Sequence, residues 1–355
     1  MKIKTITATP VTIPYAAPVG PYIGRGGLPG TLGAHGLIVR VETDAGLVGW
    51  GEGTGAFETD PDAVLAGRHA ADIESVVAAL EEAGIGRGPM SGVEMALWDL
   101  LGKQAGLPIC RLMGGVVRTE IDFCACMGLK EPTESAATAR EYVDRWGFRF
   151  LKTKAGVDSD QDLRIARAVQ KEVGAVAVFR PDANGGYPPE ETVAIMKKMR
   201  DLGIRFFEDP CSVENPETLV RVRNEVGMGI LVNGGVGLPE SVRPLLEARV
   251  ADMLMPDTPA AGALIRIKKI AAIAEVWNVP CLMHCSHDLG LKTAAILHIA
   301  ASTPNFSGPN DTCYHGLTDD ILAEPLTFEN GQISVPSGPG LGVEVDASKI
   351  EKYRA

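Results

Sequence analysis

The chain repeats one structural unit from residue 118 onward, where short apolar runs alternate with amphipathic stretches of helical period. Successive runs end 23 to 28 residues apart, which is the length of a strand, a helix and two turns. Seven such units in succession predict a barrel of parallel strands, with a doubly wound open sheet as the alternative. The runs are IDFCACM, FRFLKTK, AVAVFRPDA, IRFFEDP, GILVNGG, ADMLMPD and VPCLMHC.

Residues 1–115 have a different pattern, in which strands come first and helices follow. The first 55 residues or so alternate apolar and polar side chains around glycine-rich turns, one of them at residues 20–30. Apolar residues at helical spacing come next. We therefore predict a small α+β domain over 1–115, a barrel over 116–325 and a C-terminal tail of short strands over 326–355.

Composition excludes two classes of protein. The formal net charge is −11 and no block of Lys or Arg interrupts the chain, so a nucleic-acid role is not expected. No apolar run approaches the roughly 18 residues of a membrane helix, and the first residues lack the apolar core of a secretion signal, so we expect a cytoplasmic protein with no membrane partner. Seven cysteines without C-x-x-C spacing are expected to be buried thiols.

Polar residues stand at the ends of six successive runs, where barrel enzymes place their chemistry. One such residue is usually a helix cap or a turn residue, but six in a row are hard to explain by capping. Acids on neighbouring strands suit Mg²⁺, which takes one or two carboxylates and completes its shell with water and substrate. The residues are Lys152, Lys154, Asp182, Asn184, Glu208, Asp209, Asn233, Asp257, His284 and His287.

The order and spacing of these motifs resemble the enolase superfamily, in the branch of mandelate racemase and muconate lactonizing enzyme. The segment SGVEMALWDLLGKQAGLPICRLMGG resembles the end of that family's capping domain. KTK, RPDANGGY and FFEDP resemble its lysine and metal-ligand motifs, and MPD and PCLMHCSHDLG its Asp and His strand ends. The implied fold is α/β: a modified (β/α)₇β TIM-type barrel under an α+β capping domain, formed by the N-terminal region and completed by the C-terminal tail.

The resemblance also implies a chemistry, the Mg²⁺-dependent removal of a proton next to a carboxylate to give a metal-stabilised enediolate. Asp182 and Glu208 would hold the metal. Lys154 would be the base, and the positive charge of neighbouring Lys152 favours its neutral amine. Lys152 would stay cationic and bind a carboxylate oxygen of the substrate. These two roles explain why Lys152 and Lys154, two residues apart on one strand, point to the same face. Asn184 is expected at the substrate.

The resemblance implies a second catalytic group, His284, with Asp257 orienting its ring. The favoured reaction is dehydration of a hydroxy or sugar acid, in which His284 protonates the leaving hydroxyl. Racemisation or epimerisation and cycloisomerisation are the alternatives within catalysis. Three residues in or near the loop of the capping domain are candidates for substrate specificity, and the family usually forms homo-oligomers. These three are Tyr22, Arg25 and His35.

The chain departs from the family at the end of the fifth barrel strand, where a third acidic metal ligand is expected. The sequence there is LVNGGVGLPE, with Gly234 or Gly235 in the place of the acid. Asn233 could bind the metal through its amide oxygen, or water could fill the position, and either lowers the metal affinity. A non-catalytic carboxylate-binding protein without metal is therefore a further alternative.

Overall fold

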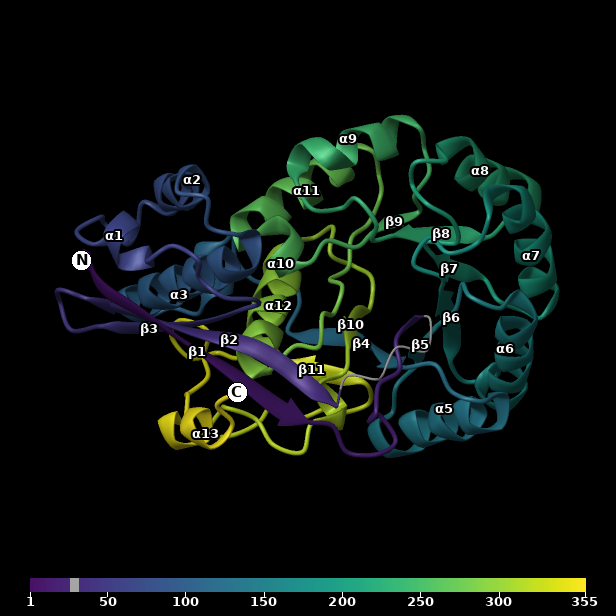
Figure 1. Cartoon of the computed structure of the whole chain (residues 1–355), viewed down its shortest axis with the longest axis horizontal. Coiled ribbons are helices and arrows are strands. Elements are labelled where there is room, and N and C mark those ends of the chain that lie inside the picture. Colours follow the sequence, from purple (N-terminus) through teal and green to yellow (C-terminus); the bar gives the residue numbers. More distant parts are fainter. Residues whose placement is uncertain (26–31) are drawn as a thin grey trace.

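An antiparallel sheet from the N-terminus lies to one side of the molecule in the computed structural model, which describes residues 1–25 and 32–355 (Figure 1). The last part of the predicted turn at 20–30 lies outside these residues. The strands pair in the order β1-β2-β3, and α3 packs on β3. The elements are β1 Ile3–Pro14, β2 Gly33–Thr43, β3 Val48–Gly53, α1 Pro61–Leu65, α2 Ile73–Glu82, α3 Arg87–Ala105 and α4 Ile109–Leu112.

Parallel strands form the second part, in the order β10-β4-β5-β6-β7-β8-β9. Residues 281–284 close the ring between β9 and β10, because Cys281 bridges to Leu254 and Met283 accepts the backbone N–H of Asp311. The predicted (β/α)₇β barrel is thus confirmed and the open sheet excluded. The strands are β4 Glu120–Met127, β5 Phe150–Lys154, β6 Val178–Asp182, β7 Phe206–Glu208, β8 Gly229–Val232, β9 Met253–Leu254 and β10 Asn310–Thr312.

Helices surround this ring on its outside (Figure 1). Several of them begin with a proline, whose missing N–H is not needed at the first turn of a helix. The helices are α5 Pro132–Trp146, α6 Ser159–Val173, α7 Pro189–Asp201, α8 Pro216–Arg221 continued by a π-helix Val222–Val226, α9 Pro239–Glu247, α10 Thr258–Ala261, α11 Leu264–Val276 and α12 Gly290–Ser302. Among the residues described, no helix has both the length and the apolar character to cross a bilayer.

The C-terminal segment returns to both parts of the molecule. It contains a 3₁₀ turn at Tyr314–Gly316, β11 (Gln332–Ser334) and α13 (Ala347–Lys352). Strand β11 pairs antiparallel with β4 of the barrel, while the last residues bond to β1 through Thr12 N–H to Tyr353 O and Ala355 N–H to Pro10 O. The boundaries of the three predicted regions stay a prediction.

Two buried glutamates attach the N-terminal part to the barrel. Glu94 of α3 accepts the backbone N–H of Leu264 at 2.8 Å, at the start of α11. Glu52 of β3 accepts the N–H groups of Leu289 and Lys292, both at 2.8 Å, at the start of α12. The first turn of a helix has N–H groups without helical partners, so side-chain oxygens that accept from them stabilise it. The N-terminal part is therefore attached to the barrel at the first turns of two helices, α11 and α12.

The buried Glu52 predicts a pH dependence of stability. Burial, helped by the charge of Asp288, raises its pKa to about 8 in the folded state. An unfolded glutamate titrates near 4.3, so ionisation of Glu52 opposes folding and its cost grows as the pH rises from about 4.5 to 8. We expect Glu52→Gln to gain stability relative to the unsubstituted chain between pH 5.5 and 8.5, as measured by urea unfolding. The exposed Glu58→Gln is the control, and a pH-independent difference for Glu52→Gln would contradict the assignment.

Candidate active site

The register of the barrel strands places the predicted polar residues in two layers. Lys154 pairs with Asp182, and Asp182 pairs with Glu208, so these three share the upper layer at the carboxyl ends of β5, β6 and β7. Lys152 pairs with Arg180 one layer below. Alternate residues of a barrel strand point inward and stack in layers, which is why residues two apart in sequence lie above one another.

Lys152 is the centre of a buried cluster of charges. Its ammonium lies 2.8 Å from Glu208 Oε1, 2.8 Å from Asp311 Oδ2 and 3.2 Å from Asp182 Oδ2. Burial alone would lower the pKa of Lys152, but the three carboxylates outweigh it and raise the pKa well above its ordinary value. Lys152 is therefore a fixed cation near neutral pH.

Lys154 stands above this cluster and keeps part of its side chain exposed. Its Nζ lies 2.6 Å from Asp182 Oδ2. Burial would raise the pKa of Asp182, but Lys154 and Lys152 outweigh it and hold the pKa below the ordinary range. Burial, together with the charge of Asp182, raises the pKa of Glu208. The structure thus brings the predicted base next to Asp182, and Asp182 next to the second predicted metal ligand, Glu208.

His284 and Asp257 also meet as expected. The ring Nδ1 of His284 lies 3.1 Å from Asp257 Oδ2. Lys292 donates to Asp257 Oδ1 at 2.6 Å and to Asp288 at 2.5 Å, and Ser286 Oγ donates to Asp257 as well. Burial would raise the pKa of Asp257, but Lys292 and His284 outweigh it and lower the pKa, so an ionised carboxylate fixes the ring.

Two residues of this cluster, Asp311 and Arg180, were not predicted from the sequence. Asp311 on β10 accepts from Lys152 and from Arg180, and Arg180 Nη2 also lies 3.1 Å from Glu208 Oε2. Arg180 precedes Asp182 by two residues on one strand, so the alternation of the strand could have placed it in the cluster. Asp311 follows no apolar run of its own, and its partner Lys152 is 159 residues away in sequence.

The capping loop reaches this end of the barrel. Arg25 donates to the carbonyl of Asn184 at 2.9 Å, and Tyr22 packs edge-on against the ring of His287 with centroids 4.6 Å apart. The hydroxyl oxygen of Tyr15 lies 2.9 Å from His287 Nδ1. Burial, with the charges of neighbouring cations, lowers the pKa of His287 to about 4, so this ring is neutral near pH 7.

The other two candidates for substrate contact have partners within the protein. His35 on the exposed side of β2 lies 2.8 Å from Thr12 Oγ1. Asn184 donates its backbone N–H to Asp182 Oδ1 at 2.9 Å and its side-chain amide to Asp182 Oδ2 at 3.2 Å. Asn184 thereby orients a carboxylate, and its contact with substrate stays a prediction.

The carboxylate of Asp209, which directly follows the neighbouring strand β7, lies beside Gly234. Asp209 accepts the backbone N–H groups of Asn233 at 3.1 Å and Gly234 at 2.8 Å, and a Cβ added at Gly234 would lie 3.4 Å from Asp209 Oδ2. Burial, with the charges of Glu208 and Asp182, raises the pKa of Asp209 to about 7. The side-chain amide of Asn233 donates to Met255 O at 2.8 Å, and its role as a metal ligand stays a prediction.

The acids present fit a hard divalent cation. Asp182 and Glu208 both reach the Lys152 ammonium, so the two carboxylates converge on a place suited to positive charge. Glu208 Oε2 is buried and has no hydrogen-bond partner among the described residues. The Arg180 guanidinium lies 3.1 Å from this oxygen without hydrogen-bond geometry, so the oxygen can still accept a metal ion.

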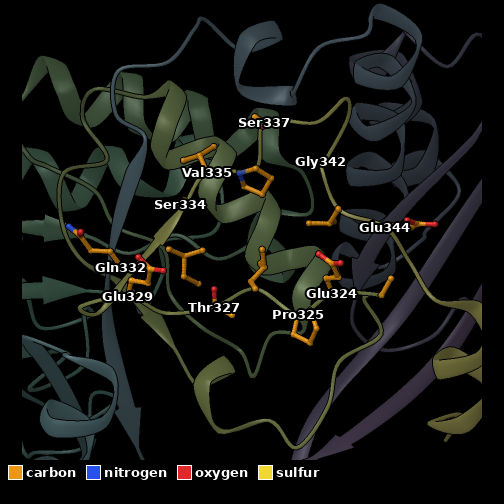
Figure 2. A pocket seen from close by; sticks show the side chains of 15 residues that line it. Glu324, Pro325, Thr327, Glu329, Gln332, Ser334, Val335, Ser337, Gly342 and Glu344 are labelled. Atoms are coloured by element: carbon orange, nitrogen blue, oxygen red, sulfur yellow. The ribbon is translucent and has the colours of Figure 1, made fainter.

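A separate hollow of about 590 Å³ lies in the C-terminal segment (Figure 2). Its lining includes Glu324, Glu329 and Glu344 and shares no residue with the lysine cluster. We therefore place the candidate active site at the carboxyl ends of the barrel strands and not in this hollow.

Comparisons with known proteins cover most of the chain. Residues 30–114 match the N-terminal domain of mandelate racemase / muconate lactonizing enzyme, and residues 134–349 match the enolase C-terminal domain-like family. The chain is 31% identical to D-galactarolactone cycloisomerase of Agrobacterium fabrum, covering 90% of this chain and 91% of that protein. It is 28% identical to D-xylonate dehydratase of Haloferax volcanii, covering 89% and 85%.

A third relative has a solved structure. L-Ala-D/L-Glu epimerase of Bacillus subtilis is 29% identical, covering 97% of both chains. Its complex with substrate superposes with a TM-score of 0.88 at 28% identity, covering 98% of this chain and 100% of that chain. The relatives thus include a cycloisomerase, a dehydratase and an epimerase.

The charge cluster predicts how the chain responds to loss of Lys152. In Lys152→Met, three buried carboxylates lose a shared cation, so we expect stability to fall by about 3–5 kcal/mol at pH 7.5. The loss should shrink toward pH 5, because the carboxylates can then take up protons. Urea unfolding at both pH values measures this, with exposed Lys4→Met as the control. A loss no larger than that of the control would contradict the cluster.

Proposed function

We propose that this chain, which belongs to the mandelate racemase / muconate lactonizing enzyme family, removes the proton next to a carboxylate and dehydrates a hydroxy or sugar acid. The observation that supports it most is the position of two proton-transfer groups beside the paired carboxylates. Lys154 contacts Asp182, and a ring nitrogen of His284 lies within 4.8 Å of a carboxylate oxygen of Glu208. A base and an acid therefore flank one site.

Each residue then has a task. Asp182 and Glu208 would hold Mg²⁺, which as a Lewis acid supplies positive charge for the substrate carboxylate. Lys154, which lies 2.6 Å from Asp182, would accept the α-proton as the base. Lys152 keeps its charge and holds a carboxylate oxygen. His284, oriented by Asp257, donates a proton to the leaving hydroxyl.

Dehydration is preferred over the alternatives because the two proton-transfer groups differ in kind. A Lys and a His–Asp pair suit different steps, proton removal from carbon and proton donation to oxygen. Epimerisation, in which His284 returns a proton to the same carbon, uses the same residues. The product distinguishes the two reactions, because dehydration gives a keto acid and epimerisation gives an isomer of the substrate. Relatives that dehydrate xylonate or isomerise galactarolactone make sugar acids the first substrates to test.

The first test is exchange of the α-proton. With Mg²⁺ and xylonate, arabinonate, glucarate or an Ala-Glu dipeptide in D₂O, we expect NMR to show loss of the α-proton signal and formation of a keto acid from one sugar acid. Lys154→Ala should slow this about 10²–10⁴-fold, as expected for loss of a general base. Exposed Lys171→Ala is the matched control. Exchange without keto acid would favour epimerisation, and no exchange with any acid would favour a carboxylate-binding protein.

The second test concerns the missing ligand. Gly234→Glu should tighten Mg²⁺ binding about tenfold in calorimetry, because it adds a carboxylate at the place where the family has one. Gly235→Glu is the contrasting variant, since its backbone φ of +76° is unfavourable for any side chain and should cost stability. An unchanged Mg²⁺ affinity in a folded Gly234→Glu would show that position 234 does not face the metal.

A further inference from the structure

A second set of possible ligand atoms lies beside the proposed Mg²⁺ pair, and it contains a histidine. One carboxylate oxygen each of Glu208 and Asp311 and one ring nitrogen of His284 all lie within 4.8 Å of one another. In a tetrahedral Zn²⁺ site with bonds near 2.0–2.2 Å, ligand atoms are about 3.4 Å apart. Small side-chain movements would therefore bring the three onto one ion.

His284 is already arranged as a metal-binding histidine. Its Nδ1 faces Asp257 Oδ2 at 3.1 Å, which leaves Nε2 for a ligand. Metal-binding histidines almost always donate the other ring N–H to a carboxylate, backbone carbonyl or water, which fixes the tautomer and the ring orientation. Lys292 holds Asp257 in turn at 2.6 Å. The structure thus supplies the outer support of a metal site as well as its ligands.

Glu208 belongs to both sets of possible ligands. Its side chain is fully buried, and Oε2 has no hydrogen-bond partner among the described residues, although Arg180 Nη2 lies 3.1 Å away outside hydrogen-bond geometry. Asp311 accepts from Lys152 and Arg180, one bond on each oxygen, and a carboxylate oxygen can accept more than one. Both carboxylates can therefore bind an ion without losing all their present contacts.

The nature of the ligands selects the metal. Mg²⁺ prefers oxygen ligands in octahedral geometry, whereas Zn²⁺ readily takes one imidazole nitrogen and two carboxylates and keeps its fourth position for water. Zn²⁺ also binds N/O sites more tightly than earlier first-row metals such as Mn²⁺. The charges of Lys152 and Arg180 oppose any cation here, so the site should be weaker than a structural zinc site.

We propose that Glu208, Asp311 and His284 form a second metal site that takes Zn²⁺ and differs from the Asp182 and Glu208 pair assigned to Mg²⁺. Binding of Zn²⁺ is independent of the proposed function. Its consequence rests on that function: Zn²⁺ occupies the ring nitrogen that would donate the proton and shares Glu208 with Mg²⁺, so Zn²⁺ inhibits the enzyme.

The experiment measures Zn²⁺ and Mg²⁺ binding separately, by competition with a chelating dye and by calorimetry. We expect one Zn²⁺ per chain, with binding weakened at least about tenfold in His284→Gln and about 10–100-fold in Asp257→Asn, as for loss of an outer partner. Asp182→Asn should weaken Mg²⁺ binding and leave Zn²⁺ binding nearly unchanged. Circular dichroism checks that each variant is folded.

Two controls separate this site from other zinc ligands. Exposed His69→Gln and Cys285→Ser, which removes the thiol next to His284, should keep the Zn²⁺ affinity. Absence of stoichiometric Zn²⁺ binding, equal binding by the original chain and folded His284→Gln, or equal loss in Asp182→Asn would overturn the proposal. If Zn²⁺ binds as expected but no acid exchanges its α-proton with Mg²⁺ alone, then the proposed function fails and the metal site stands.

Discussion

The ammonium of Lys152 is the interaction on which the interior of the barrel depends. Three carboxylates from β6, β7 and β10 reach it, and in its absence each buried anion would lose one of its counter-ions. Arg180 supplies a second cation to two of the same acids. Because the strands that contribute these residues lie on both sides of β5, the cluster joins the end of the barrel to its beginning and closes the ring electrostatically.

The sequence predicted the fold because its signals are local. The period of the βα units and the alternation of the first strands need only neighbouring residues, and the barrel and the N-terminal sheet were found where these patterns occur. Most of the candidate site followed from one rule, that polar residues at strand ends converge. Lys154, Asp182, Glu208 and the pair of Asp257 and His284 obey it.

The rest depends on contacts between distant segments. Asp311 lies on a strand of three residues without a pattern of its own, and nothing local links it to Lys152. Lys292 is one charge on a buried helix that looks apolar throughout, and only the fold shows that it holds Asp257. The absence of an acid at Gly234 was visible in the sequence. That the carboxylate of Asp209 lies beside Gly234 is shown only by the folded structure.

The attachment of Glu52 to α12 links the N-terminal sheet to the proposed acid, His284. Glu52 accepts the backbone N–H of Lys292, whose side chain holds Asp257, which in turn holds His284. Four residues thus form one continuous chain of contacts from the N-terminal sheet to the His284 ring, the proposed proton donor. If the sheet lifts away from the barrel, the first turn of α12 loses its anchor, and the His284 imidazole loses the support of Lys292 and Asp257 at the same time.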